Sequence, residues 1–246
     1  MSGSFAALED EFALIAESAA QAGIGQDGIP EVRRNWVSVP TGGRVSAVLW
    51  GSGPPEVVFL HEAGRTARAW DEVALRLGRP SAAIDLPGHG RSDSRRSIRT
   101  GPRTLADPIA EAIRSLAPRA TLVAGSGLGG RAALALITTP RPTFLRRLAL
   151  IDTLPGTASR GQQAGTGVAD PHADDVSLWE ELAGLANPAF LIRAEHSGRI
   201  TAADLLELEQ RGPGVTVITI PGAAQDLVAD QPAALASELS RLASAP

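Results

Sequence analysis

The sequence contains no cysteine, no lysine and no tyrosine, and only one methionine. Without cysteine the chain can form neither a disulfide nor a thiolate metal site, and a cytoplasmic location is the default expectation. The missing lysine and tyrosine remove two side chains that often transfer protons or form covalent intermediates in enzymes. All 23 lysine-or-arginine positions are arginine, a bias that suggests a GC-rich bacterial genome.

The sequence also lacks long apolar runs and a strong net charge. No stretch of about 18 apolar residues is present, so we expect no transmembrane helix. The net charge of −4 gives no general attraction to nucleic acid or to an anionic membrane, and we expect neither partner. Residues 9–11 are acidic, whereas a signal peptide carries positive charge near its start. We find no cofactor motif and expect neither a cofactor nor a metal.

Apolar patterning predicts alternating strands and helices over most of the 246 residues, enough for one large α/β domain. Strands are predicted at residues 36–39, 45–49, 57–60, 82–85, 121–124, 148–152, 190–193 and 215–218. Helices are predicted at residues 5–22, 67–77, 105–116, 176–185, 202–210 and 232–242. A hairpin followed by regular alternation indicates a doubly wound, mainly parallel sheet.

The stretch that most constrains function is residues 121–136, near the middle of the chain, which read T-L-V-A-G-S-G-L-G-G-R-A-A-L-A-L. A short β run, a glycine-rich turn and a helix in immediate succession are typical of a nucleophile elbow. The small-x-nucleophile-x-small pattern fits best with Gly125 and Gly129 at the small positions. Gly127 then stands at the nucleophile position, where no side chain can attack. A register one residue earlier makes Ser126 the nucleophile but places Leu128 where a small residue is needed.

Other loop motifs accompany this elbow in a characteristic order. His61 follows a predicted strand, D-L-P-G-H-G-R-S-D occupies residues 85–93, and P-G-A-A-Q-D occupies residues 221–226. Together with the elbow these motifs resemble the α/β-hydrolase family over nearly all of residues 37–242. The resemblance implies an α/β-hydrolase fold with a mainly parallel eight-stranded sheet. It also implies one domain at residues 31–246, with a reduced cap at about residues 153–187, preceded by a helix and linker at residues 1–30.

The resemblance also identifies the catalytic positions, and the sequence departs from the family at each of them. The nucleophile position is Gly127. The family's histidine position is Gln225, whose amide cannot act as a base. The acid position falls on His196 or Ser197, with the carboxylate of Glu195 offset by one or two residues. Loss of the nucleophile and the base together argues against an acyl-enzyme, because the triad acts as a unit.

The resemblance places the oxyanion hole at the backbone N–H groups of Leu128 and Ala63. Glu62 stands where the family usually has glycine, and two interpretations are open. If Glu62 points into an apolar pocket, desolvation suits it to acid/base chemistry. Otherwise it faces solvent or pairs with Arg65 or Arg68.

Three further groups of residues are candidates for function. His196 and Asp152 could transfer protons beside Glu62, although Asp152 could instead form a turn. Ser126, Gly127 and Gln225 could position a ligand, and Trp70 could line the pocket or belong to the core. A cluster of arginines could anchor an acidic carrier protein or simply be solvated: Arg91, Arg95, Arg96, Arg99 and Arg103.

The preferred functional hypothesis at this point is an enzyme that does not use a serine nucleophile. Cyclisation, elimination, isomerisation or epoxide opening of a small, largely apolar organic substrate would need only positioning and acid/base groups. Specialised-metabolite biosynthesis is a plausible setting. The alternatives are a non-catalytic small-molecule binder and a residual hydrolase that uses Ser126.

Overall fold

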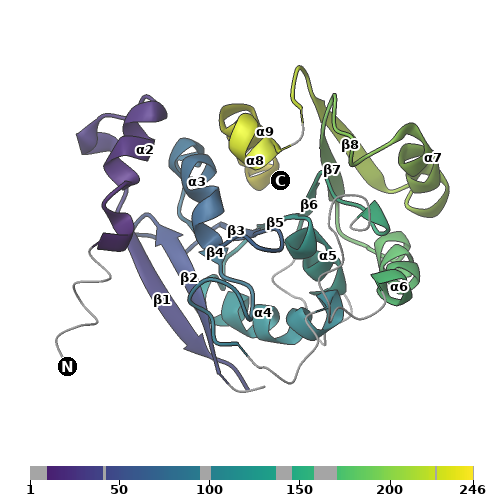
Figure 1. Cartoon of the computed structure of the whole chain (residues 1–246), viewed down its shortest axis with the longest axis horizontal. Helices are drawn as coiled ribbons and strands as arrows, with labels where there is room; N and C mark the ends of the chain where they lie inside the picture. The colour runs from purple at the N-terminus through teal and green to yellow at the C-terminus, as the bar shows by residue number, and fades with distance from the viewer. Residues whose placement is uncertain are drawn as a thin grey trace.

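The computed structural model describes residues 10–40, 43–94, 101–136, 146–157, 171–224 and 226–245. These residues form one eight-stranded sheet in the order β1-β2-β4-β3-β5-β6-β7-β8 (Figure 1). The β1–β2 and β2–β4 pairs are antiparallel, and the remaining pairs are parallel. The α/β-hydrolase architecture expected from the sequence is confirmed.

The strands are β1 (Val32–Ser38), β2 (Arg44–Trp50), β3 (Val57–Leu60), β4 (Ser81–Ile84), β5 (Leu122–Ser126), β6 (Leu148–Ile151), β7 (Ala189–Ala194) and β8 (Val215–Ile220). The α-helices are α2 (Ile15–Gln21), α3 (Asp71–Leu77), α4 (Pro102–Leu116), α5 (Leu128–Ala135), α6 (Pro171–Ala183), α7 (Ala202–Arg211), α8 (Leu227–Asp230) and α9 (Pro232–Ser244). Short 3-10 helices are η1 (Asp10–Phe12), η2 (Gln26–Gly28) and η3 (Ala67–Trp70).

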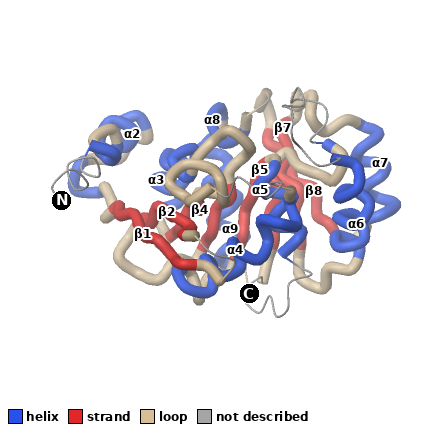
Figure 2. Tube along the Cα trace, turned by 60° about the horizontal axis from the view of Figure 1, so that its bottom comes forward, coloured by secondary structure: helices blue, strands red, loops and turns tan. Residues whose placement is uncertain are grey.

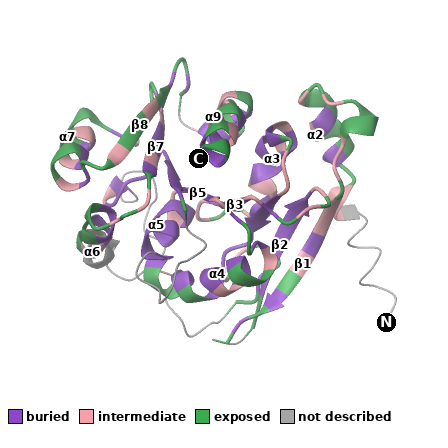
Figure 3. Ribbon diagram, turned by 180° about the vertical axis from the view of Figure 1, so that it is seen from behind, coloured by how far each residue is buried: buried purple, intermediate pink, exposed green. Residues whose placement is uncertain are grey.

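Helices cover both faces of the sheet. Helices α3 and α9 lie on one face and α4 and α5 on the other (Figure 1). Each face has its own cluster of buried apolar side chains. The central strands β3 and β5 are therefore buried along their whole length (Figure 3), which explains why neither sequence alternates between apolar and polar residues.

The structure differs from the sequence prediction at several element boundaries. The N-terminal helix is interrupted: η1 precedes a short α2, and residues 1–9 lie outside the described part of the chain. Strand β5 continues to Ser126, because its last two residues pair with β6. Helix α6 begins five residues earlier than predicted, and α8 was not predicted.

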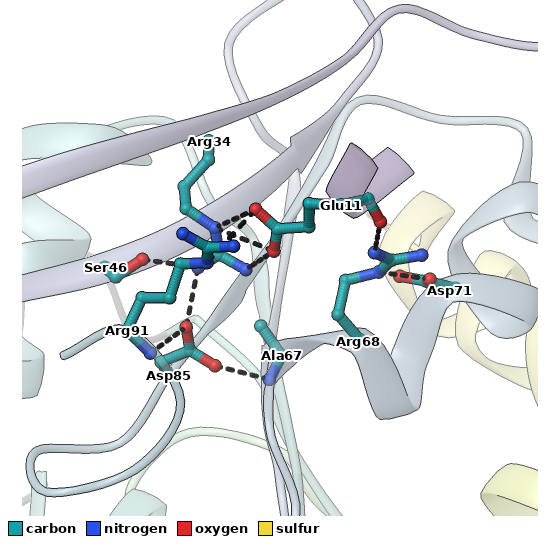
Figure 4. A network of polar contacts seen from close by, with 8 residues as sticks. All are labelled: Glu11, Arg34, Ser46, Ala67, Arg68, Asp71, Asp85 and Arg91. Carbon is teal, nitrogen blue, oxygen red and sulfur yellow. Dashed lines mark hydrogen bonds and ion pairs between the residues drawn. The ribbon is translucent and has the colours of Figure 1, made fainter. Parts of the chain in front are cut away.

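A buried ionic network fastens the N-terminal segment to the sheet. The guanidinium of Arg34 on β1 donates hydrogen bonds to Glu11 of η1 and to Asp85 after β4 (Figure 4). Asp85 also accepts the backbone N–H groups of Ala67 at 2.7 Å and Arg91 at 3.1 Å. Figure 2 shows the result: α2 lies at one end of the molecule beside α3, and α6 and α7 lie at the other end.

Candidate active site

The glycine-rich turn between β5 and α5 has the backbone geometry of an elbow. Gly127 adopts φ 53° and ψ −119°, a conformation that L side chains rarely adopt. Its N–H donates to the hydroxyl of Thr153 at 2.7 Å. A Cβ on Gly125 would lie 2.7 Å from the Gly129 backbone, so the close approach of strand and helix requires glycine. The structure therefore places Gly127 at the apex and Ser126 at the end of β5.

The carboxylate of Glu62 lies against the apex. A Cβ built on Gly127 would be 2.7 Å from Glu62 Cγ and 3.1 Å from Oε1. Oε1 accepts a hydrogen bond from Arg199 Nη1 at 2.8 Å, and the Glu62 side chain is 21% exposed. The expected pairing with Arg65 or Arg68 is wrong, because those arginines pair with Asp226 and Asp71 instead. Glu62 is thus held at the elbow by Arg199, which comes from the loop after β7.

Ser126 opens into a small cavity of about 50 Å³ that it shares with Glu62, His61, Trp70 and Asp226. The Ser126 residue is 8% exposed. Its hydroxyl makes no hydrogen bond to another residue in the part of the chain that the structure describes. Ser126 therefore combines a hydroxyl without a partner among the described residues with a place in the lining of a cavity that Glu62 and Asp226 also line.

Trp70 fulfils both of the roles left open by the sequence. Its side chain is fully buried and stacks on Phe59 with ring centroids 4.8 Å apart, as a core residue does. The same indole forms part of the wall of the Ser126 cavity. Trp70 therefore gives this cavity one apolar side.

His61 has a structural role. Its Nδ1–H donates to the Glu62 carbonyl at 2.8 Å, and its Nε2 accepts the Leu86 N–H at 3.0 Å. Burial lowers the pKa of His61 to about 4, so the imidazole is neutral at physiological pH. With both ring nitrogens engaged, His61 cannot take a proton from Ser126.

Two backbone N–H groups beside the elbow remain available for an anion. Neither Leu128, the first residue of α5, nor Ala63 donates a hydrogen bond to another described residue. A helix N-terminus next to a strained turn favours developing negative charge. The two N–H groups that the family resemblance implies thus have no acceptor among the described residues.

Asp152 is buried immediately after β6 in a conformation rare for residues other than glycine, with φ 44°. Oδ1 accepts the Ala194 N–H at 3.0 Å, whereas Oδ2 has no hydrogen-bond partner among the described residues. Burial raises the pKa of Asp152 to about 6, against the opposing effects of the hydrogen bond from the Ala194 N–H and the positive charge of Arg199. Asp152 does not line the Ser126 cavity, so the structure shows it beside the site and not in it.

Asp152→Asn is expected to change how stability depends on pH. The folded-state pKa of about 6 lies above the ordinary 3.8. The folded protein binds this proton more tightly than the unfolded chain does. The resulting contribution to the free energy of unfolding is therefore complete below about pH 4 and is lost as the pH rises to 6. Relative to the variant, the wild type should lose about 1–3 kcal/mol of unfolding free energy between pH 4 and 7. Urea unfolding at each pH measures this; parallel curves would show that Asp152 titrates normally.

Of the remaining candidates, those that the structure describes do not line the cavity. The His196 side chain is 67% exposed, and its Nε2 lies 3.7 Å from the Glu195 carboxylate at the surface. Gln225 lies outside the described residues. Among the clustered arginines, Arg91 pairs with Glu11 and Arg103 with Glu181, while Arg95, Arg96 and Arg99 lie outside the described residues. A carrier-protein contact there remains a prediction.

Sequence reasoning missed Arg199 and Thr153. Arg199 acts on a carboxylate 137 positions away in the chain, so no local pattern marks it. Thr153 accepts the Gly127 N–H and donates to the Ile151 carbonyl at 2.6 Å. A small polar residue two positions after the end of the strand next to the elbow was its only signal.

Two observations on the described residues concern membranes and metal ions. Within the described residues, none of the helices is long and apolar enough to cross a membrane. The same residues contain no cluster of three or more histidine, aspartate or glutamate side chains that could bind a metal ion.

Comparison with known proteins identifies the family. No protein-family model matches the chain. The sequence is 32% identical to Esterase Rv0045c of Mycobacterium tuberculosis, over 92% of this chain and 93% of that protein. A solved structure of that esterase matches with a TM-score of 0.82 at 28% identity, covering 96% of this chain and 99% of the other. This chain belongs to the α/β-hydrolase family.

Other matches to this α/β-hydrolase are partial or more distant. A pimeloyl-[acyl-carrier protein] methyl ester esterase of Pectobacterium atrosepticum is 30% identical, over 45% of this chain and 43% of that protein. The thioesterase domain from the curacin biosynthetic pathway matches with a TM-score of 0.71 at 20% identity, covering 85% of this chain and 99% of that domain. At that identity the likeness shows the fold alone.

The comparisons correct the functional hypothesis. An enzyme for cyclisation, elimination, isomerisation or epoxide opening is wrong, because the relative matched over nearly its full length is named an esterase. Specialised-metabolite biosynthesis finds no support either. The comparisons favour the alternative that the sequence analysis kept open, a hydrolase that uses Ser126. That alternative ranked lower because Leu128 occupies a position where the elbow pattern needs a small residue.

Proposed function

We propose that this α/β-hydrolase cleaves carboxylic esters with Ser126 as the nucleophile. The observation that carries the proposal is the uncommitted Ser126 hydroxyl in the same cavity as the Glu62 carboxylate. Kinship with an esterase over nearly the whole chain supports the reaction type. We further propose that the usual triad is absent, since Gly127 and Gln225 occupy two of its sequence positions.

The residues present can complete both halves of ester cleavage. Glu62 takes the proton of Ser126 as Oγ attacks the ester carbonyl, as a carboxylate general base can do. The oxyanion of the tetrahedral intermediate accepts hydrogen bonds from the Leu128 and Ala63 N–H groups. Collapse breaks the bond to the alkoxide, which takes the proton from Glu62 and leaves as the alcohol. Water then attacks the acyl-enzyme by the same route and releases the acid.

The cavity size favours short acyl groups. At about 50 Å³, it holds the equivalent of only a few water molecules, since each needs about 10–15 Å³. The reacting carbonyl and one or two carbons fit there, and a long acyl chain would have to lie outside. We therefore expect activity to fall as the acyl chain lengthens.

A chromogenic assay combined with a covalent probe tests the proposal. The purified protein should hydrolyse 4-nitrophenyl acetate and butyrate faster than the octanoate, above the rate of heat-denatured protein. A fluorophosphonate probe should label Ser126, as mapped by peptide mass spectrometry. Absence of hydrolysis would refute the ester-cleaving function. Labelling at another serine would refute the assignment of the nucleophile.

A further inference from the structure

Arg199 reaches across the sheet to the elbow. It lies in the loop between β7 and α7, where its backbone N–H donates to the Ser197 hydroxyl at 3.1 Å. Its side chain pairs with Glu62, which follows β3. Strands β5 and β6 stand between β3 and β7 in the sheet. The ion pair therefore passes over the end of β5, where the reacting carbonyl must lie.

Toward the described residues, the side chain of Arg199 uses only one of its three nitrogen atoms as a donor. Nη1 donates to Glu62, whereas Nε and Nη2 donate to none of the residues that the structure describes. The side chain is 34% exposed. Apart from Glu62, the charge of Arg199 also acts on the buried Asp152, but no hydrogen bond joins the two side chains. A partly exposed guanidinium with free donors is a ready bidentate site for a carboxylate.

The distances place this guanidinium close to the apex of the elbow, one residue after Ser126. Glu62 Oε1 is 3.1 Å from the position of a Cβ on Gly127 and 2.8 Å from Arg199 Nη1, so Nη1 is within about 6 Å of that position. Two or three methylene groups span such a distance. We propose that Arg199 binds a second carboxylate on the acyl part of the substrate, so that the preferred substrates are monoesters of short dicarboxylic acids. This inference rests on the proposed ester hydrolysis.

The substrate carboxylate and Glu62 use different donors of the same guanidinium. Nη1 keeps its hydrogen bond to Glu62, while Nε and Nη2 lie on one edge of the planar group and can donate together to a second carboxylate. Arg199 therefore holds the second carboxylate of the substrate beside Glu62, which fixes the position of the acyl group as well as adding affinity.

Two esters that differ only in this carboxylate test the inference. In 4-nitrophenyl hemiglutarate the terminal methyl group of the valerate ester is replaced by a carboxylate. The wild type should prefer the hemiglutarate in kcat/KM by about 10- to 100-fold, the effect of a hydrogen bond between charged groups. Arg199→Gln should abolish the preference, with kcat and KM both affected on the hemiglutarate. Arg241→Gln, which removes an exposed arginine on α9, should leave it unchanged.

The outcomes separate this inference from the proposed function. Equal kcat/KM for both esters in the wild type, or an unchanged ratio in Arg199→Gln, would overturn the role of Arg199 while ester hydrolysis stands. If neither ester is cleaved, calorimetry with glutarate and valerate decides. If the wild type binds glutarate and the Arg199→Gln variant does not, the result supports the carboxylate site and rejects the hydrolase. Equal or absent binding of both would reject the carboxylate site.

Discussion

Ser126→Ala is expected to lower kcat/KM for short esters by at least about 10³-fold, the loss typical of a missing nucleophile. Stability should change by less than about 0.5 kcal/mol, because the hydroxyl makes no hydrogen bond in the described structure. A large kinetic loss without a stability loss is the signature of a hydroxyl retained for chemistry. Ester hydrolysis and urea unfolding of the same preparations measure both quantities.

Ser81 provides a matched control for this experiment. Its hydroxyl is also buried without a hydrogen-bond partner among the described residues, but it stands at the start of β4. Ser81→Ala removes the same atom and should leave kcat/KM unchanged. Glu62→Gln should lower kcat by about 10²–10⁴-fold, because the amide keeps the shape but cannot accept the proton. Full activity of Ser126→Ala would mean that another group makes the attack.

The fold could be predicted from the sequence because its signals are local. The run Val57–Leu60 is the observed β3 to the residue, since a strand buried on both faces must be apolar throughout. The Gly127 apex was placed correctly because its conformation demands glycine and its close neighbours must be small. Boundaries set by long-range pairing were less predictable, as the extension of β5 to Ser126 shows.

The site was less predictable because its interactions join distant parts of the chain. Glu62 was recognised as unusual, but its partner could not be found among neighbouring arginines when Arg199 comes from another loop. His196 was placed at the site from its position after β7, yet its side chain faces solvent. Sequence position specifies a loop, whereas the direction of a side chain depends on the tertiary contacts of that loop.

Asp85→Ala is expected to destabilise the protein by about 3–5 kcal/mol, the usual cost of leaving one member of a buried ion pair without its partner. Asp85 is fully buried and lies 2.6 Å from Arg34, which is itself almost fully buried (Figure 4). The substitution also leaves the Ala67 and Arg91 N–H groups without their acceptor. Urea unfolding measures the loss. The exposed pair on α9 is the comparison: Glu238→Ala should cost no more than about 1 kcal/mol.

A second substitution separates the buried charge from the lost packing. The double variant Arg34→Met with Asp85→Ala is compared with the two single variants: Glu11 loses Arg34 and keeps Arg91 in both variants that lack Arg34. The loss in the double variant should be smaller than the sum of the two single losses, because the Arg34–Asp85 pair is broken only once. Additive losses would show that Arg34 and Asp85 act independently. Asp85 also holds the first residue of η3, and Trp70 at the end of η3 walls the Ser126 cavity. Asp85→Ala should therefore lower ester hydrolysis even where the protein remains folded, because η3 loses its anchor and the cavity loses its rigid wall.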